Sequence, residues 1–344
     1  MMCEQINRVR SFRRAGLAAA VALMAASMAE VVQAEDNGAN AALRYWQVWA
    51  QLDPSLIKAI DAGPTEGIDQ PDWTAPAALV KAVADENVMG ALERAAYMDH
   101  ADFGAEVDRF PETILAHLSL LHRSIRLLMI RARLATDAGE HAKTARALAA
   151  GYRVAHHSLM DGLLITSANG VAYFNGIDMV VRYAIGRGAL DAEDRALLRD
   201  ALSKYPDDDP FLTESAIVKE SGLIVRWLSQ AWGSGDRALD AQRVVARLRE
   251  LAREDADLSG VEAALAERED LETELTLFEL LNKQAVAVWN QPDAPVALAG
   301  FEKSASEGAF GLVAKAYSPP FVVLHERDTL GRRLIREARA RLAP

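Results

Sequence analysis

Apolar residues recur every three or four positions along most of this chain, which is the spacing of an amphipathic α-helix. Strict alternation of apolar and polar residues, which would indicate a strand, is rare. The clearest stretch, 111–138, has apolar residues at Ile114, Leu118, Leu121, Ile125, Leu128, Ala132 and Ala135. We therefore expect helices over 37–53, 77–98, 111–138, 142–159, 163–186, 191–202, 214–232, 236–253, 261–289, 311–317 and 321–342.

Breaks between these segments are marked by Pro, Gly and Asp. Asp53 and Pro54 are typical of a helix start, with Asp as the N-cap and Pro in the first turn. Gly139 predicts a tight turn between two helices, and Pro292 predicts the end of a long charged helix over 261–289. That long helix is a candidate surface for a partner or for a second copy, although packing within the chain is the simpler interpretation.

Short breaks between successive helices predict an all-α fold of layered antiparallel helical hairpins. The hairpin around Gly139 has the small and apolar residues of a tetratricopeptide-like unit. A second copy at a fixed period is not evident, so an irregular α–α array remains the alternative. We expect residues 35–344 to form a single all-helical domain.

The first 34 residues have the three parts of a secretory signal peptide. Four arginines lie within the first 14 residues, an apolar stretch covers 15–29, and Val32 and Ala34 form a small-x-small cleavage motif. The apolar stretch is shorter than the roughly 20 residues that span a bilayer. We predict a signal peptide over 1–34 and a periplasmic or secreted protein without a transmembrane helix; an uncleaved signal that serves as an anchor is the alternative.

The net charge and the cysteine content argue against nucleic acid binding and thiol chemistry as functions of this chain. Lys and Arg total 38 against 49 Asp and Glu, which gives a formal net charge of −11. Such a chain repels phosphate backbones, so we do not expect nucleic acid binding. Cys3 is the single cysteine and lies in the predicted signal, so the exported chain would have neither a disulfide nor thiolate chemistry.

The segment 101–160 resembles a pattern in uncharacterised exported bacterial proteins that are helical throughout. It is carried by Ala101-Asp102-Phe103-Gly104, Leu115-Ala116-His117-Leu118 and Arg131-Ala132-Arg133-Leu134-Ala135. The resemblance implies an exported all-helical protein with a tetratricopeptide-like hairpin. It implies no known activity, cofactor or catalytic residue, so no function is transferred to individual positions.

Two groups of side chains resemble metal-binding or catalytic pairs. On a helix, His157 and Asp161 lie one turn apart, a spacing that can hold a divalent ion. Further ligands are missing, so we favour a histidine bonded to a carboxylate at a helix end and predict no metal site. Glu214 and Glu220 could serve in acid–base chemistry, but six residues apart they face different sides of one helix.

Polar residues interrupt the apolar segment 163–186. Asp178 and Arg182 are four positions apart and can form an ion pair, and Asn175 lies on the same segment. One interpretation is a buried polar network that fixes how the helices pack. The other is the floor of a ligand pocket, where a carboxylate and an amide face the ligand.

Two functions from different classes remain. The first is a protein- or peptide-interaction module of the cell envelope with an unknown partner, because helical arrays offer extended concave surfaces. The second is a small-ligand binder or hydrolase with a pocket around 156–182. Its candidate ligand-binding residues are His157, Asp161, Asn175 and Asp178. The chain has no Gly-x-Ser-x-Gly motif and no phosphate-binding Gly-rich loop, so we predict no catalytic residue and no cofactor.

Overall fold

The computed structural model of the chain describes residues 40–63, 65–106, 115–251, 258, 260–267 and 271–343. Over these residues the chain forms fifteen α-helices, α2 to α16, and no strand beyond one isolated bridge between Asn40 and His100. The all-α prediction is confirmed. None of the described helices has the length and apolar character needed to cross a bilayer. The predicted signal peptide, 1–34, lies outside the described residues.

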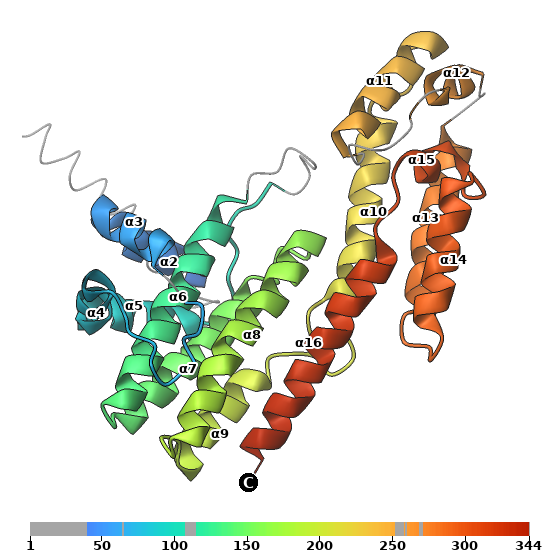
Figure 1. Ribbon diagram of the computed structural model, residues 1–344. Coiled ribbons are helices and arrows are strands. Elements are labelled where there is room, and N and C mark those ends of the chain that lie inside the picture. The colour runs from blue at the N-terminus through green and yellow to red at the C-terminus, as the bar shows by residue number, and fades with distance from the viewer. Residues whose placement is uncertain are drawn as a thin grey trace, which may run out of the picture.

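Eight helices form a first lobe (Figure 1). They are α2 (Ala41–Ala50), α3 (Pro54–Ala62), α4 (Ala77–Ala84), α5 (Glu86–Ala96), α6 (Ala116–Asp137), α7 (His141–His157), α8 (Leu164–Gly186) and α9 (Ala192–Leu202). Their buried side chains make one continuous hydrophobic cluster. The helices α6 and α7 are joined at Gly139, whose φ of 73° is the left-handed conformation that glycine adopts without strain.

Six further helices form a second lobe with a hydrophobic cluster of its own. They are α10 (Thr213–Ser229), α11 (Arg237–Leu251), α12 (Val261–Ala266), α13 (Glu272–Val288), α14 (Ala294–Ser306) and α15 (Gly311–Ala316). The helix α13 lies at the centre of this lobe and packs against α10, α14 and α15.

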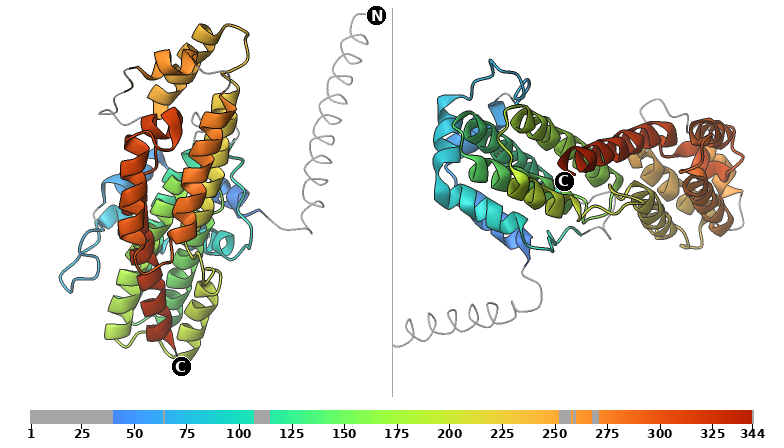
Figure 2. Two further views of the ribbon diagram at one scale, coloured as in Figure 1. Left: turned by 90° about the vertical axis from the view of Figure 1, so that its right-hand side faces the viewer. Right: turned by 90° about the horizontal axis from the view of Figure 1, so that it is seen from below.

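The last helix, α16 (Phe321–Leu342), joins the two lobes. Phe321 near its start belongs to the second cluster, whereas Ile335 and Leu342 near its end belong to the first. It packs against α14 at one end and against α8 and α9 at the other, as the view from below shows (Figure 2). At the crossing, Gly331 leaves room for Phe211, since a Cβ there would lie 2.7 Å from the ring. The lobes are therefore held together by a helix that contributes to both cores.

Two of the predicted helices are each divided into two, and one further helix lies where none is predicted. The segment 77–98 is two helices, because Asp85 caps the second by accepting from the backbone N–H of Asn87 at 2.9 Å. The segment 261–289 is also two helices, α12 and α13, so the long charged helix does not exist. The helix α14 lies in a segment where the periodicity predicts no helix, and Pro295 stands in its first turn, where proline is well tolerated.

Candidate binding site

His157, a predicted ligand-binding residue, ends α7 and is buried. Its Nδ1 lies 2.9 Å from the Tyr45 hydroxyl and its Nε2 lies 2.8 Å from the carbonyl oxygen of Met98. Because a carbonyl can only accept, Nε2 carries the ring proton and Nδ1 accepts from Tyr45. Burial lowers the pKa of His157 to about 3, so the ring is neutral near pH 7. It joins α2 to the segment that follows α5.

Asp161 is placed apart from His157. Since α7 ends at His157, the helical spacing that suggested a shared ion does not exist. Asp161 Oδ2 instead lies 2.6 Å from Nε2 of His117, whose ring stacks on Phe103 with centroids 4.4 Å apart. The carboxylate thus has a histidine partner, though from α6 rather than from α7. No group of three His, Cys, Asp or Glu side chains in the described part of the chain is arranged to hold a metal ion.

Asp178 lies in the middle of α8 and is fully buried. Its two carboxylate oxygens accept from Nη1 and Nη2 of Arg341 at 2.9 and 2.8 Å, and Oδ1 also accepts from the Tyr152 hydroxyl at 2.9 Å. The expected pair with Arg182 is present at 3.3 Å. These contacts form a buried polar network across α7, α8 and α16. Asn175 is half-buried on the same helix.

The four predicted residues do not share a partner. Among the described residues, no hydrogen bond or ion pair links His157, Asp161, Asn175 and Asp178 to one another. Three of them are instead engaged by separate groups: a tyrosine with a backbone carbonyl, a second histidine, and two arginines with a tyrosine.

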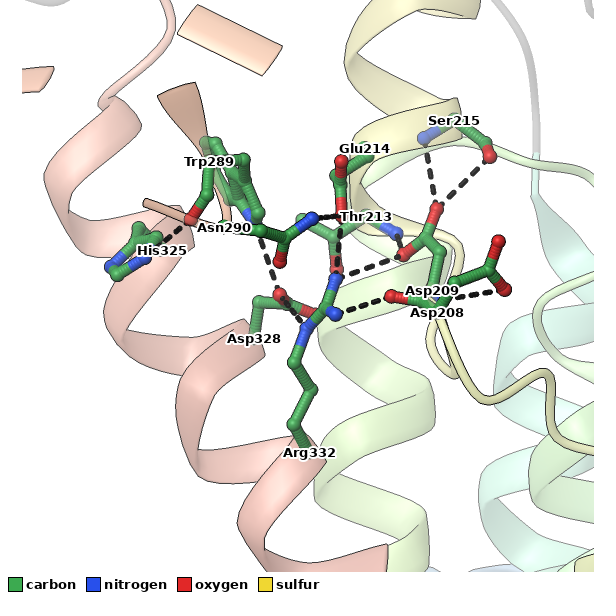
Figure 3. A network of polar contacts seen from close by, with 10 residues as sticks. All are labelled: Asp208, Asp209, Thr213, Glu214, Ser215, Trp289, Asn290, His325, Asp328 and Arg332. Carbon is green, nitrogen blue, oxygen red and sulfur yellow. Dashed lines mark hydrogen bonds and ion pairs between the residues drawn. The ribbon is translucent and has the colours of Figure 1, made fainter. Parts of the chain in front are cut away.

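A polar network that sequence reasoning missed lies between the lobes; we call it the polar seam (Figure 3). Its centre is Arg332 of α16. The guanidinium contacts Asp328 through Nε at 2.5 Å and Glu214 through Nη2 at 2.6 Å. It also donates to the backbone carbonyl of Asp208 and lies 3.9 Å from the Asp209 carboxylate. One arginine thus binds its own helix, the start of α10 and the segment between the lobes.

The buried carboxylate of Asp328 needs the positive charge of Arg332 to be stable within the polar seam. This carboxylate is buried and accepts from Trp289 Nε1 at 3.0 Å through the same oxygen that meets Arg332. The other oxygen, Oδ1, has no hydrogen-bond partner among the residues that the structure describes. A buried carboxylate without a nearby cation is costly, so the guanidinium is the group that stabilises this charge. The arrangement holds three segments of the chain together.

The segment between the lobes turns sharply before α10. Leu212 has a φ of 54°, and it is the one residue other than glycine with a positive φ in the described ranges. A branched side chain in this conformation indicates local strain. The strain is opposed by Asp209, whose carboxylate accepts from the backbone N–H of Thr213 at 2.8 Å and of Ser215 at 3.1 Å.

Glu220 is a buried carboxylate where α10 meets α8. It accepts from the backbone N–H of Leu164, in the first turn of α8, at 2.6 Å. No ion pair within the described ranges reaches it, and its charge adds to the effect of burial in raising the pKa of the nearby Tyr317 hydroxyl. Burial raises the pKa of Glu220 to about 7. Glu214, six positions earlier, points to Arg332 instead, as its place on the other side of the helix predicts.

Two surface hollows have the chemistry of binding surfaces. The first, which we call the acidic groove, lies between α10 and α13 and has a volume of about 460 Å³. Its lining consists of Val225, Ser229, Trp232, Leu271, Glu272, Leu275, Thr276 and Glu279. Apolar side chains therefore stand beside two carboxylates.

The second hollow lies between α2 and α5 in the first lobe and has a volume of about 420 Å³; we call it the arginine hollow. It is lined by Arg44, Gln47, Val48, Gln51, Ala91, Arg94 and Met98. Here guanidinium and amide groups stand beside apolar side chains, so its charge is opposite to that of the acidic groove.

Comparison with known proteins gives no relative: no family model, no curated protein and no solved structure matches the chain. The resemblance to exported helical proteins therefore stays a prediction. What this chain binds has to be argued from its own surfaces.

Proposed function

We propose that this chain is an exported protein- or peptide-interaction module of the cell envelope, and that the acidic groove is its recognition surface. The carrying observation is a groove with an apolar lining and two carboxylates between two long helices. Grooves between helices receive amphipathic helices through their apolar side, with charges at the edge setting orientation. The partner that matches this groove is a cationic amphipathic segment.

The groove residues supply both parts of such recognition. Val225 and Trp232 are partly exposed and offer apolar area, whereas the two leucines of the lining are buried. Tryptophan is enriched among the residues that dominate binding energy. Glu272 is exposed and has no ion pair among the described residues, so its charge is free to meet a partner's lysine or arginine. Glu279 already lies 3.2 Å from Lys283 and contributes less.

The alternative, a small-ligand binder or hydrolase, is less well supported. It requires His157, Asp161, Asn175 and Asp178 to face one pocket. Three of these side chains have partners that lie in different places, and the contacts of Asp178 already compensate its charge. A ligand at that position would have to displace interactions that stabilise the buried groups.

Binding of a model peptide tests the proposal. A labelled amphipathic helix of Leu and Lys should bind residues 35–344 in fluorescence anisotropy, whereas its Leu and Glu counterpart should not. Thr276→Arg places a bulky cation in the groove and should weaken binding about tenfold, or about 1.4 kcal/mol. Ala287→Arg, on an exposed position of the same helix outside the groove, is the matched control. Equal affinity for both peptides, or equal loss in both variants, would reject the groove.

Export is tested separately. N-terminal sequencing of the protein from the cell envelope fraction should give a chain that begins at Glu35. A protein recovered with its first 34 residues intact would favour the anchor instead of the cleaved signal.

A further inference from the structure

The arginine hollow contains two guanidinium groups that the fold does not neutralise. Arg44 and Arg94 line it from α2 and α5, and no ion pair within the described ranges involves either of them. Most arginines that hold this fold together, such as Arg131 and Arg341, contact carboxylates. In a chain with an excess of acidic residues, two unpaired cations in one concave site indicate a place for an external anion.

The walls of this hollow are held in place from behind. His157 accepts from Tyr45 of α2 and donates to the carbonyl of Met98, whose side chain lines the hollow. Asn40, the N-cap of α2, donates to the carbonyl of Asp102 at 2.7 Å and accepts from its backbone N–H at 2.9 Å. These bonds fix α2 against the segment after α5. The site is thus formed before any ligand arrives, which reduces the ordering cost of binding.

The lining of the hollow also restricts the chemistry of the anion. Two guanidinium groups balance a phosphate monoester, which carries a charge of about −1.5 to −2 at pH 7, better than they balance one carboxylate. Gln47 accepts from Arg44 Nη1 at 3.1 Å, which orients the guanidinium and leaves its other N–H groups available. Gly90 leaves space for Arg94, whose Nη1 lies 3.3 Å from where a Cβ would be.

We propose that the arginine hollow binds the phosphate group of an amphiphilic phosphate monoester. Arg44 and Arg94 hold the phosphate, and Val48 and Met98 contact the carbon chain that carries it. Two sources share this chemistry: a soluble organic phosphate and a phosphomonoester lipid headgroup. On α2, Leu43 and Trp46 are 54% and 40% exposed, and such side chains insert into the interfacial layer of a bilayer when the headgroup belongs to a lipid.

Calorimetric titration of residues 35–344 with inorganic phosphate and with glycerol 3-phosphate tests the soluble source. Flotation with phosphatidylcholine vesicles, with and without phosphatidic acid, tests the lipid source. Arg44→Gln combined with Arg94→Gln should weaken binding of the effective probe at least about tenfold. Arg187→Gln combined with Arg336→Gln, at exposed positions outside the hollow, makes the same change in net charge and should leave binding unchanged.

Each outcome decides the proposal. Saturable binding of glycerol 3-phosphate that requires Arg44 and Arg94 supports a soluble ligand. Flotation that requires phosphatidic acid, Arg44, Arg94 and also Trp46, tested as Trp46→Ser, supports the lipid headgroup. The proposal is overturned if no probe binds saturably, or if the two double variants lose binding equally. Thermal unfolding of all variants by circular dichroism confirms that these exposed substitutions leave the fold intact.

Discussion

Burial shifts the pKa values of two histidines of the first lobe and of one glutamate of the second in opposite directions. The first lobe holds His156 and His157, and burial lowers their pKa values to about 4 and about 3. The second lobe holds Glu220, and burial raises its pKa to about 7. Burial disfavours the charged form in each case, but the charged form of histidine appears in acid and that of glutamate in base. The titration of His156 and His157 therefore contributes a loss of stability to the first lobe in acid, whereas the titration of Glu220 contributes a gain to the second.

The surfaces of the lobes differ in the same way. The arginine hollow of the first lobe exposes Arg44 and Arg94, while the acidic groove of the second exposes Glu272. The net charge of −11 describes neither surface. The net charge of the whole chain therefore affects non-specific electrostatic attraction. Specific recognition instead depends on which charged side chains the fold leaves without an ion pair.

Arg332→Ala is expected to have the largest effect on this two-lobe arrangement. It leaves Asp328 buried without a cation, a loss of about 3–5 kcal/mol in the free energy of unfolding. Without the polar seam, urea denaturation followed by circular dichroism should show two separate transitions. Arg333→Ala removes a neighbouring exposed arginine and should cost less than about 1 kcal/mol. If Arg332→Ala unfolds in a single transition at the wild-type midpoint, the lobes do not depend on the polar seam to unfold together.

Glu220→Gln should remove the contribution of this carboxylate to the pH dependence of the second lobe. With a folded pKa of about 7 and an ordinary pKa of 4.5, Glu220 contributes stability below pH 4.5 that is lost as the pH rises through 7. The variant cannot ionise, so at pH 8 it should exceed the wild type by about 3 kcal/mol, and at pH 4 the two should agree. Chemical denaturation at both pH values measures this. Equal stability at pH 8 would mean that the carboxylate is compensated there.

His157→Gln should act in the opposite direction. With a folded pKa of about 3 against an ordinary 6.5, His157 contributes stability above pH 6.5 that is lost as the pH falls toward 3. Between pH 6.5 and 5 this amounts to about 2 kcal/mol in the wild type. The free energy of unfolding of the variant is lower at pH 6.5 because packing is lost, but it should fall less than that of the wild type between pH 6.5 and 5. Hydrogen exchange of the amides in α2 and α7 at both pH values locates the effect in the first lobe.

Gly331→Ala is the smallest change and tests the crossing of α16. A Cβ would lie 2.7 Å from the Phe211 ring and 3.1 Å from Val171, so overpacking should cost about 1 kcal/mol. Gly300→Ala in α14 is the matched control, because nothing lies within 4 Å of its Cβ and alanine favours the helix. Thermal melting of the two variants should shift in opposite directions, and a parallel shift would contradict a tight crossing.

Features that depend on neighbours along the chain could be predicted. Asp53 caps α3 by accepting from the backbone N–H of Ser55 at 2.7 Å, and Gly139 makes the predicted turn. The pair of Asp178 and Arg182 also follows from its spacing. Asp85 is an N-cap residue like Asp53, so the sequence contained the signal for a helix start there. Apolar residues continue at helical spacing on both sides of Asp85, however, so the periodicity predicts one continuous helix.

The candidate site could not be predicted in the same way. The sequence indicates that Asp178 belongs either to a buried polar network or to a pocket floor, but its partner Arg341 lies 163 positions away in the chain. His157 is a candidate from the sequence as well, but its hydrogen bond is to Tyr45, 112 positions away. In the sequence, the polar seam is visible only as the four-residue spacing of Asp328 and Arg332. Nothing in the sequence indicates that Glu214 also contacts Arg332.

The sequence by itself determined the helical class and most helix boundaries, because helix formation depends on contacts within about four residues. Only the tertiary structure decided how the helices divide into two lobes, and which charges are paired, buried or left exposed in a hollow. Those properties depend on segments that are distant along the chain and meet only on folding. The same physics sets the pKa of His157 and of Glu220, because burial is a property of the folded core and not of the local sequence.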